Sequence, residues 1–223
     1  MPLRLPLFPL GMVLFPGLVL PLHVFEDRYR QMVRELLALP EDQRRFGVVA
    51  IRQGREVGAD GIQALHEVGC VAHLRRADEL EDGRFDVLST GTARFALREV
   101  DAGGPYMVGS VDVLPDRLGD EGEAPLLDAA VRVAFRTYLA ALARASQEPV
   151  PLPELPDDPL VLGYLVAATT ALDLDERQRL LAQPDGTSRL RSELAVLRRE
   201  TTLLTRLSAA PAPELARGPV SPN

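Results

Sequence analysis

Short apolar runs alternate with prolines through the first twenty residues. Leu5 to Leu10, Met12 to Phe15 and Leu18 to Leu20 are apolar runs of strand length. Proline fixes φ and removes a backbone donor, so the runs cannot merge into one long helix. Between the second and third runs, Pro16 suits the first corner of a turn and Gly17 tolerates the positive φ of the second corner. The pattern predicts short buried strands with a tight turn between the last two.

Past Pro21 the apolar period changes from that of a strand to that of a helix. One face of the predicted helix is apolar and carries Phe25, Tyr29, Met32, Val33, Leu36 and Leu37. The opposite face is charged and carries Glu26, Arg30 and Arg34. This arrangement is typical of an amphipathic helix that packs on the preceding strands.

Strand signals continue to residue 116. The predicted strands are Phe46–Arg52, His66–Leu74, Phe85–Thr90, Arg94–Leu97 and Tyr106–Leu114. Gln53 to Ala64 holds glycines among charged residues, which predicts a mobile surface loop. Asp82-Gly83 is a hairpin-turn signal between the second and third of these strands. Residues 1–116 are expected to form about seven strands and one helix.

Helical periodicity takes over after a charged, glycine-containing linker at residues 116–125. Asp158 and either Asp173 or Asp175 are candidate N-caps, the first of them followed by a proline at the first helical position. The last helix carries a leucine-rich seam at alternating spacings of four and three that is expected to pack on the other helices: Leu190, Leu194, Leu197, Thr201 and Leu204. The four predicted helices span residues 126–145, 159–172, 176–182 and 188–207.

The charge balance narrows the classes of partner. The formal net charge is −7, and all 25 basic residues are arginine because the sequence contains no lysine. Acidity argues against nucleic-acid binding, and the missing lysine excludes a P-loop or a Ser–Lys dyad. No leader and no apolar stretch of membrane-spanning length is recognisable, so we expect a cytoplasmic protein that does not bind membranes. The single cysteine, Cys70, excludes an internal disulfide.

The chemically competent side chains indicate structure rather than catalysis. His66, Cys70 and His73 are zinc-ligand types, but on a strand only the first two share a face, and two ligands do not make a site. His23 lies between apolar neighbours and is expected to be a hydrogen-bonded structural histidine. The charges from Glu26 to Arg30 are expected to form local pairs at a solvated helix start. We predict no enzymatic activity, no metal and no cofactor.

Several segments resemble, in matching order, the N-terminal substrate-binding domain of Lon proteases. The first are Pro-Leu-Phe-Pro-Leu (6–10), Val-Leu-Phe-Pro-Gly (13–17) and Leu-Pro-Leu-His-Val-Phe-Glu-Asp-Arg-Tyr (20–29). Two strands follow, Glu-Val-Gly-Cys-Val-Ala (67–72), with cysteine in place of the usual threonine, and Leu-Ser-Thr-Gly-Thr-Ala-Arg-Phe (88–95). Asp-Pro (158–159), Ala-Leu-Asp-Leu-Asp-Glu-Arg-Gln-Arg-Leu-Leu (171–181) and the last helix resemble the helical part. The chain is similar to stand-alone bacterial proteins built from this domain.

This resemblance implies an α+β fold, with a PUA-like β pseudobarrel followed by a helical bundle. We expect a PUA-like β subdomain with one helix at residues 1–118, a four-helix subdomain at 119–208 and a disordered tail at 209–223. The implied function is recognition of unfolded or exposed apolar protein segments, without an ATPase or protease module. The implied partners are client proteins and a protease or chaperone system. The residues of the shared structural motif are Pro16, Gly17, Glu26, Arg28, Gly69, Gly91 and Arg94.

Client binding is expected on the first strand–helix unit, which has more apolar residues than one small barrel needs inside. The candidate residues are Phe15, Leu18, Phe25 and Tyr29, on the condition that they are partly exposed. Two other functions stay open at this point. One is a PUA-like RNA-binding module, which the acidity disfavours, and the other is a small-molecule-binding domain, which requires an apolar pocket with convergent polar groups.

Overall fold

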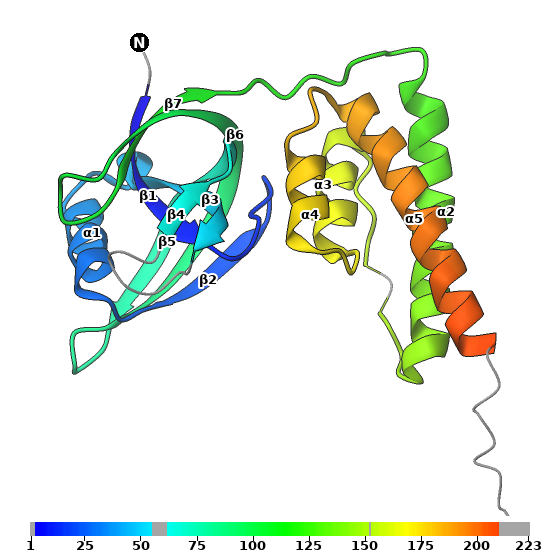
Figure 1. The fold of residues 1–223 in the computed structure, drawn as a ribbon, viewed down its shortest axis with the longest axis horizontal. Coiled ribbons are helices and arrows are strands. Elements are labelled where there is room, and N and C mark those ends of the chain that lie inside the picture. Colours follow the sequence, from blue (N-terminus) through cyan, green and yellow to red (C-terminus); the bar gives the residue numbers. More distant parts are fainter. Residues whose placement is uncertain (1–2, 55–61, 152, 210–223) are drawn as a thin grey trace, which may run out of the picture.

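A ring of β-strands forms the first half of the molecule, and helices form the second half (Figure 1). The structure is a computed structural model that describes residues 3–54, 62–151 and 153–209. Within these residues the strands are β1 (Leu3–Leu10), β2 (Val19–Val24), β3 (Arg45–Gly54), β4 (Ile62–Leu65), β5 (Val68–Glu79), β6 (Phe85–Asp101) and β7 (Val108–Val113).

The first strand closes the ring because it has partners on both edges. Its first half pairs antiparallel with β7, and its second half pairs parallel with β3. The ring order is β1-β7-β6-β5-β3, while β2 pairs with the first part of β6 and β4 pairs with the end of β3. Closure into a barrel leaves few free strand edges. The predicted α+β fold, a β pseudobarrel followed by helices, is confirmed.

Helix α1 (Asp27–Leu37) completes the barrel core. Its buried side chains pack with barrel residues, and the ring of Tyr29 stacks on that of Phe8 at a centroid distance of 4.2 Å. The predicted amphipathic helix is thereby confirmed. Phe25, however, lies before the first turn and is 51% exposed, outside the buried face. A single 3-10 turn, η1 (Glu41–Gln43), leads on to β3.

Glycines allow two backbone segments to approach the barrel wall closely. A Cβ on Gly91 would lie 2.4 Å from the carbonyl oxygen of Phe15. A Cβ on Gly69 would lie 2.5 Å from the carbonyl oxygen of Val48 and 2.4 Å from the ring of Phe95. Real Cβ atoms do not come so near to other heavy atoms, so these two positions require the absence of a side chain.

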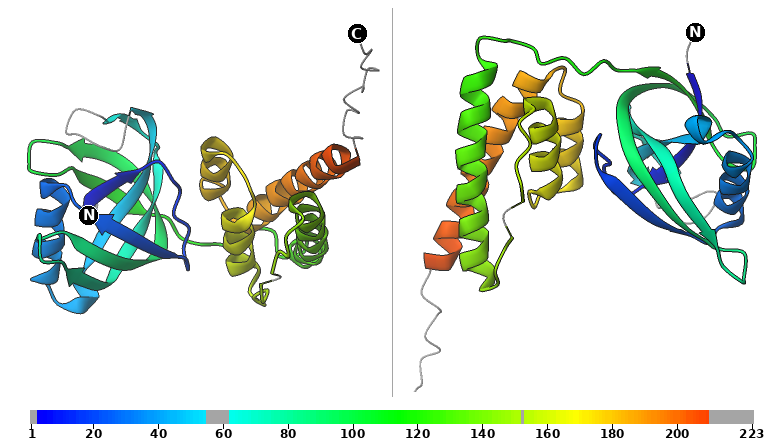
Figure 2. Two further views of the ribbon diagram at one scale, coloured as in Figure 1. Left: turned by 90° about the horizontal axis from the view of Figure 1, so that it is seen from below. Right: turned by 180° about the vertical axis from the view of Figure 1, so that it is seen from behind.

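The helices are α2 (Ala124–Ser146), α3 (Pro159–Thr169), α4 (Leu174–Leu181) and α5 (Gly186–Ala209), each within a few residues of its predicted range. The predicted caps form, since the side chain of Asp158 accepts from Leu160 N and that of Asp173 accepts from Glu176 N. Helices α2 and α5 lie side by side, and α3 and α4 lie between this pair and the barrel (Figure 2). Within the described ranges, none of the helices combines the length and the apolar character needed to cross a membrane.

Three strand predictions are wrong. Met12 to Phe15 is irregular backbone, although Leu14 and Phe15 are buried, and the Gly91 backbone bonds to Gly17 and Leu18 instead. The two strands predicted at 85–90 and 94–97 are one strand, β6, which continues through register shifts. Part of the predicted loop at 53–64 is strand, since β3 extends to Gly54 and β4 pairs with it. The rest of that loop, 55–61, lies outside the described residues.

The barrel and the helices share a buried junction. Phe15 and Ala50 from the barrel half pack with Tyr164 of α3 and Leu181 of α4 in one apolar cluster. The predicted subdomain boundary at 118/119 falls between the end of β7 and the start of α2, and the division into subdomains stays a prediction. The predicted disordered tail, apart from Ala209, lies outside the described residues.

Candidate functional site

The residues predicted to bind clients do not share one exposed surface. Phe15 is fully buried at the junction, where its ring centroid lies 6.2 Å from that of Tyr164. Tyr29 is only 5% exposed, since it packs under Phe8 in the barrel core. The condition of partial exposure is therefore not met by these two residues. Leu18 is half-buried between the two cores, and Phe25 remains accessible.

Phe25 lies near a shallow apolar surface on the outside of β2. We call the exposed residues Val19, Pro21, Phe25 and Leu88 the β2 surface. Leu88 on β6 pairs with Pro21, so these two side chains lie next to each other across the strands. The depression beside them is about 420 Å³ and includes His23 together with Arg76, Asp78 and Asp86. It is therefore only partly apolar.

The structural-motif residues fix the barrel and its contact with the helices. Gly17 has φ +82° and follows Pro16 in the predicted turn, which is confirmed. Glu26 and Arg28 form an ion pair at 2.9 Å with less than a fifth of each side chain exposed, so this helix start is less solvated than expected. The guanidinium of Arg28 also lies over the ring of Tyr29, 4.5 Å from its centroid.

Arg94 is the polar anchor of the junction. Its side chain is 2% exposed, and its Nε donates to Asp116 Oδ1 at 2.9 Å. Its Nη1 donates to the carbonyl oxygens of Leu181, the last residue of α4, and of Gln183, two residues further on. Tyr164 adds a hydrogen bond from its hydroxyl to the same Asp116 oxygen at 2.6 Å. One side chain of the barrel is thus bonded to three positions outside the barrel strands.

The histidines and the cysteine occupy separate structural positions. Nδ1 of His23 lies 2.7 Å from Asp86 Oδ1, in agreement with a hydrogen-bonded role, although His23 is exposed. Nε2 of His73 lies 2.6 Å from the carbonyl oxygen of Glu41. Burial raises the pKa of the Cys70 thiol to about 12, which keeps it protonated and unreactive at neutral pH. His66 lies in the connection before β5 rather than on the strand with Cys70.

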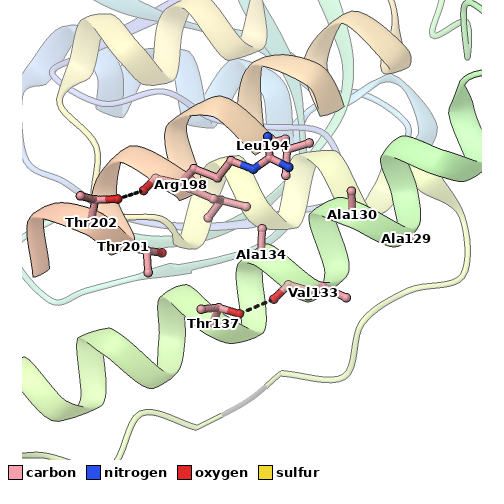
Figure 3. Close-up of a pocket in the computed structure, with 10 residues that line it drawn as sticks. Ala129, Ala130, Val133, Ala134, Thr137, Leu194, Arg198, Thr201 and Thr202 are labelled. Carbon is pink, nitrogen blue, oxygen red and sulfur yellow. Dashed lines mark hydrogen bonds between the residues drawn. The ribbon is translucent and has the colours of Figure 1, made fainter. Parts of the chain in front are cut away.

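A groove of about 670 Å³ lies between α2 and α5. Figure 3 shows side chains of both helices facing it. Residues 129–137 of α2 and 194–202 of α5 line it in parallel order, since the two helices run in the same direction (Figure 1). The lining residues are Ala129, Ala130, Val133, Ala134, Thr137, Leu194, Leu197, Arg198, Thr201 and Thr202. We call this cavity the α2–α5 groove.

The α2–α5 groove is apolar in character. Of the ten residues that line it within the described chain, Arg198 alone is charged. The hydroxyls of Thr137 and Thr202 donate to the carbonyl oxygens of Val133 and Arg198 in their own helices, which satisfies their polarity locally. Val133 is 63% exposed within this apolar lining. The groove can therefore bury apolar side chains of another molecule.

Sequence reasoning missed the α2–α5 groove for an identifiable reason. The seam of α5 was expected to pack on the other helices, and Leu190 and Leu197 are indeed buried in one cluster with residues of α2. Leu194 is only partly buried, because the small residues on α2 leave room beside it. The signal was present as a second apolar stripe of α2, Ala129, Ala130, Val133 and Ala134, next to the buried stripe. A helix with two apolar stripes has one face more than a single partner covers.

Comparison with known proteins supplies the family. The model of the "ATP-dependent protease La (LON) substrate-binding domain" matches residues 4–199. Lon protease 2 of Syntrophobacter fumaroxidans is 28% identical over 188 residues, which cover 83% of this chain and 23% of that protein. Lon protease 2 of Herpetosiphon aurantiacus is 30% identical over 207 residues, 91% of this chain and 24% of that protein. The chain thus spans about a quarter of the length of these relatives.

Solved structures agree with this match. The crystal structure of a Lon N-terminal domain protein from Xanthomonas campestris has a TM-score of 0.60 and 28% identity, and the match covers 86% of this chain and 98% of that one. The N-terminal domain of the Mycobacterium avium complex Lon protease has a TM-score of 0.58 at 18% identity, covering 89% and 98%, and shares the fold. Because the family model accounts for most of its length, this chain belongs to the Lon substrate-binding domain family.

Proposed function

We propose that this protein binds unfolded or exposed apolar segments of other proteins in the α2–α5 groove. The observation that carries the proposal is the lining of the groove, which is apolar except for Arg198 and is wide enough for several side chains. Membership of a substrate-binding domain family supports the choice of a polypeptide as ligand. We further propose that this chain has no ATPase or protease activity of its own and that a separate protease or chaperone system acts on its clients.

Apolar burial would supply most of the affinity. Each apolar side chain that leaves water for the groove contributes about 25 cal/mol per Å² of buried area. An amphipathic segment that lies along two helices can place several such side chains in a row. The side chain of Arg198 forms no ion pair or hydrogen bond among the described residues, so a carboxylate on the client finds a cation there. Clients with apolar residues and an adjacent acidic residue are expected to bind best.

Binding of a fluorescently labelled, reduced and unfolded protein tests the proposal. Val133→Asp places a charge in the groove, and Val113→Asp makes the same change on β7, where Val113 is 50% exposed. We expect Val133→Asp to raise Kd roughly tenfold or more, and Val113→Asp to leave it unchanged. Binding should also persist in about 0.5 M salt, because apolar burial is not screened. Equal Kd values for the two variants would place the site elsewhere.

The β2 surface is tested in the same assay. Phe25→Asp changes its largest exposed side chain. The neighbouring charges Arg76, Asp78 and Asp86 keep this surface more hydrated than the groove, so we expect less than a threefold change in Kd. A large loss in Phe25→Asp with none in Val133→Asp would move the client site to the barrel. Binding to a short RNA that disappears with salt, without binding to the unfolded protein, would favour the RNA-binding alternative.

A further inference from the structure

A polar cleft of about 430 Å³ lies between the barrel and helix α4, apart from the groove that the proposed function uses. The barrel side is the end of β3 and the connection from β4 to β5, and the helix side is one face of α4. Gln178 joins the two sides, since its Nε2 donates to the carbonyl oxygen of Val68 at 2.8 Å. The connection is held firmly, because His66 N donates to Ala50 O and Leu97 N donates to Glu67 O. The cleft is therefore preorganised.

Two buried polar atoms on residues of this cleft have no hydrogen-bond partner in the described structure. They are Oε1 of Gln178, a residue only 6% exposed, and Nε2 of His66. The orientation of the Gln178 amide is fixed, because only its nitrogen can donate to Val68 O. A buried acceptor without a donor is costly and rare in native proteins. A ligand that brings an N–H group to Gln178 would supply the missing partner.

Opposite charges line the cleft at separate points. The pKa of His66 is lowered, and burial is the main cause. Asp175 acts to raise this pKa and Arg52 acts to lower it, so the charges of Asp175 and Arg52 lie within electrostatic reach of the imidazole. Arg179 and Glu67 add one charge of each sign to the lining. Two arginines and two carboxylates balance, which disfavours a polyanion and favours a ligand with a carboxylate and a nearby N–H group.

We propose that this cleft binds an α-carboxylate with its adjacent N–H, the chemistry shared by a polypeptide C-terminus and a free amino acid. Arg52 and Arg179 hold the carboxylate, and the N–H donates to Gln178 Oε1. Arginine is suited to this role because its planar guanidinium can donate two parallel hydrogen bonds to one carboxylate. The cleft volume is in the range of small-ligand sites. A ligand in it would contact both halves of the molecule.

Calorimetry with the full chain and three small probes tests the site. The probes are N-acetyl-alanyl-alanine, the same dipeptide with a C-terminal amide, and free alanine. We expect the acid to bind and the amide to bind at least tenfold more weakly, because it lacks the charge that the arginines hold. Tighter binding of the acetylated acid than of alanine identifies a polypeptide C-terminus, and the reverse order identifies a free amino acid with its ammonium group near Asp175.

Two matched variants complete the experiment. Arg52→Gln should weaken binding of the acid at least tenfold, while Arg75→Gln, the same change at an exposed position on β5, should leave it unaltered. Equal binding of acid and amide, no effect of Arg52→Gln, or no binding of the acid at millimolar concentration would each overturn the proposal. This site stands independently of the α2–α5 groove, since Val133→Asp reports on the groove alone and either proposal can fail without the other.

Discussion

The barrel and the helical half bury different kinds of side chain. The barrel core is built from apolar residues and from close backbone contacts at glycine, as at Gly91. The helical half instead encloses Arg189 and Glu193, each 1% exposed, one turn apart on α5. Buried charges are costly unless they are paired, whereas apolar packing is sensitive mainly to volume. The stability of the barrel should therefore depend mainly on the shape of its side chains, and the stability of the helical half mainly on their charge.

The junction between the two regions combines both characters. An apolar cluster joins Phe15 to Tyr164, and beside it the guanidinium of Arg94 is bonded to Asp116 and to the end of α4. Arg189 lies over the ring of Tyr164 at 4.1 Å, so the charged interior of the helical half continues to this boundary. Stability and the relative placement of the two halves are thus both expected to depend on a few polar contacts.

The largest effect is expected from breaking the junction at Arg94. Arg94→Met removes a buried cation and leaves the carbonyl oxygens of Leu181 and Gln183 without their donor. We expect a loss of about 3–5 kcal/mol in the free energy of unfolding, measured by urea denaturation. The control is Arg98→Met, which breaks an exposed ion pair to Asp112 and should cost less than about 1 kcal/mol. Similar losses in the two variants would show that the junction contributes little.

The next effect separates packing in the barrel from packing in the helices. Gly91→Ala would place a Cβ 2.4 Å from the Phe15 carbonyl oxygen and should cost about 2 kcal/mol or more. Gly163→Ala on α3 places its Cβ 3.3 Å from Arg189 Cδ, and the gain of up to about 1 kcal/mol in helix propensity offsets this crowding. We expect the thermal stability of Gly163→Ala to stay close to that of the parent. A larger loss at Gly163 than at Gly91 would contradict the comparison.

The same contrast explains which parts of the structure could be predicted from the sequence. The helix start at Asp158 was predicted correctly, and Asp173 was one of two candidates for the next, because an N-cap and its proline or acidic turn are local signals. The turn at Gly17 and the hairpin through Gly83, with φ +77°, were predicted for the same reason. Periodicity also placed the buried face of α1 and the seam of α5.

What failed depends on contacts between distant segments. Phe15 is apolar in a short run, and it is buried in a cluster that includes Tyr164 of α3 and Leu181 of α4. The bonds of Arg94 to Leu181 and of Gln178 to Val68 join residues more than eighty positions apart in the sequence, which no local pattern marks. The α2–α5 groove lies between two helices that run in the same direction. Their parallel alignment depends on the path of the chain between them, which passes through α3 and α4. Tertiary context overrides local propensity at such positions.

A smaller effect is expected at the Pro16-Gly17 turn, which belongs to the barrel half but has open space around it. A Cβ at Gly17 meets no atom within 4 Å, so a substitution there changes only the backbone energy at φ +82°. Gly17→Val should cost about 1–2 kcal/mol and lower Tm by several degrees. Gly17→Asn should cost less, since asparagine tolerates positive φ better than a β-branched residue. Equal effects of valine and asparagine would show that backbone strain is not the cause.

The smallest effect is a change of pH dependence, and it addresses the charged interior of the helical half directly. Burial raises the pKa of Glu193 well above its ordinary value, while the nearby Arg189 acts to lower it. A carboxyl with a raised pKa in the folded state favours folding below its unfolded pKa, and this contribution is lost as the pH rises toward the folded pKa.

Glu193→Gln mimics the protonated form and removes the titration. The variant and the parent should therefore have similar unfolding free energies near pH 4, and the parent should become the less stable of the two as the pH rises toward 7. Urea denaturation of both proteins across this range measures the difference, and a difference that stays constant with pH would show that folding does not shift the pKa of Glu193. The control is Glu99→Gln on the exposed end of β6, which should leave the pH dependence of the parent unchanged. Gln178→Glu cannot serve as a control, because it would break the hydrogen bond to Val68 O.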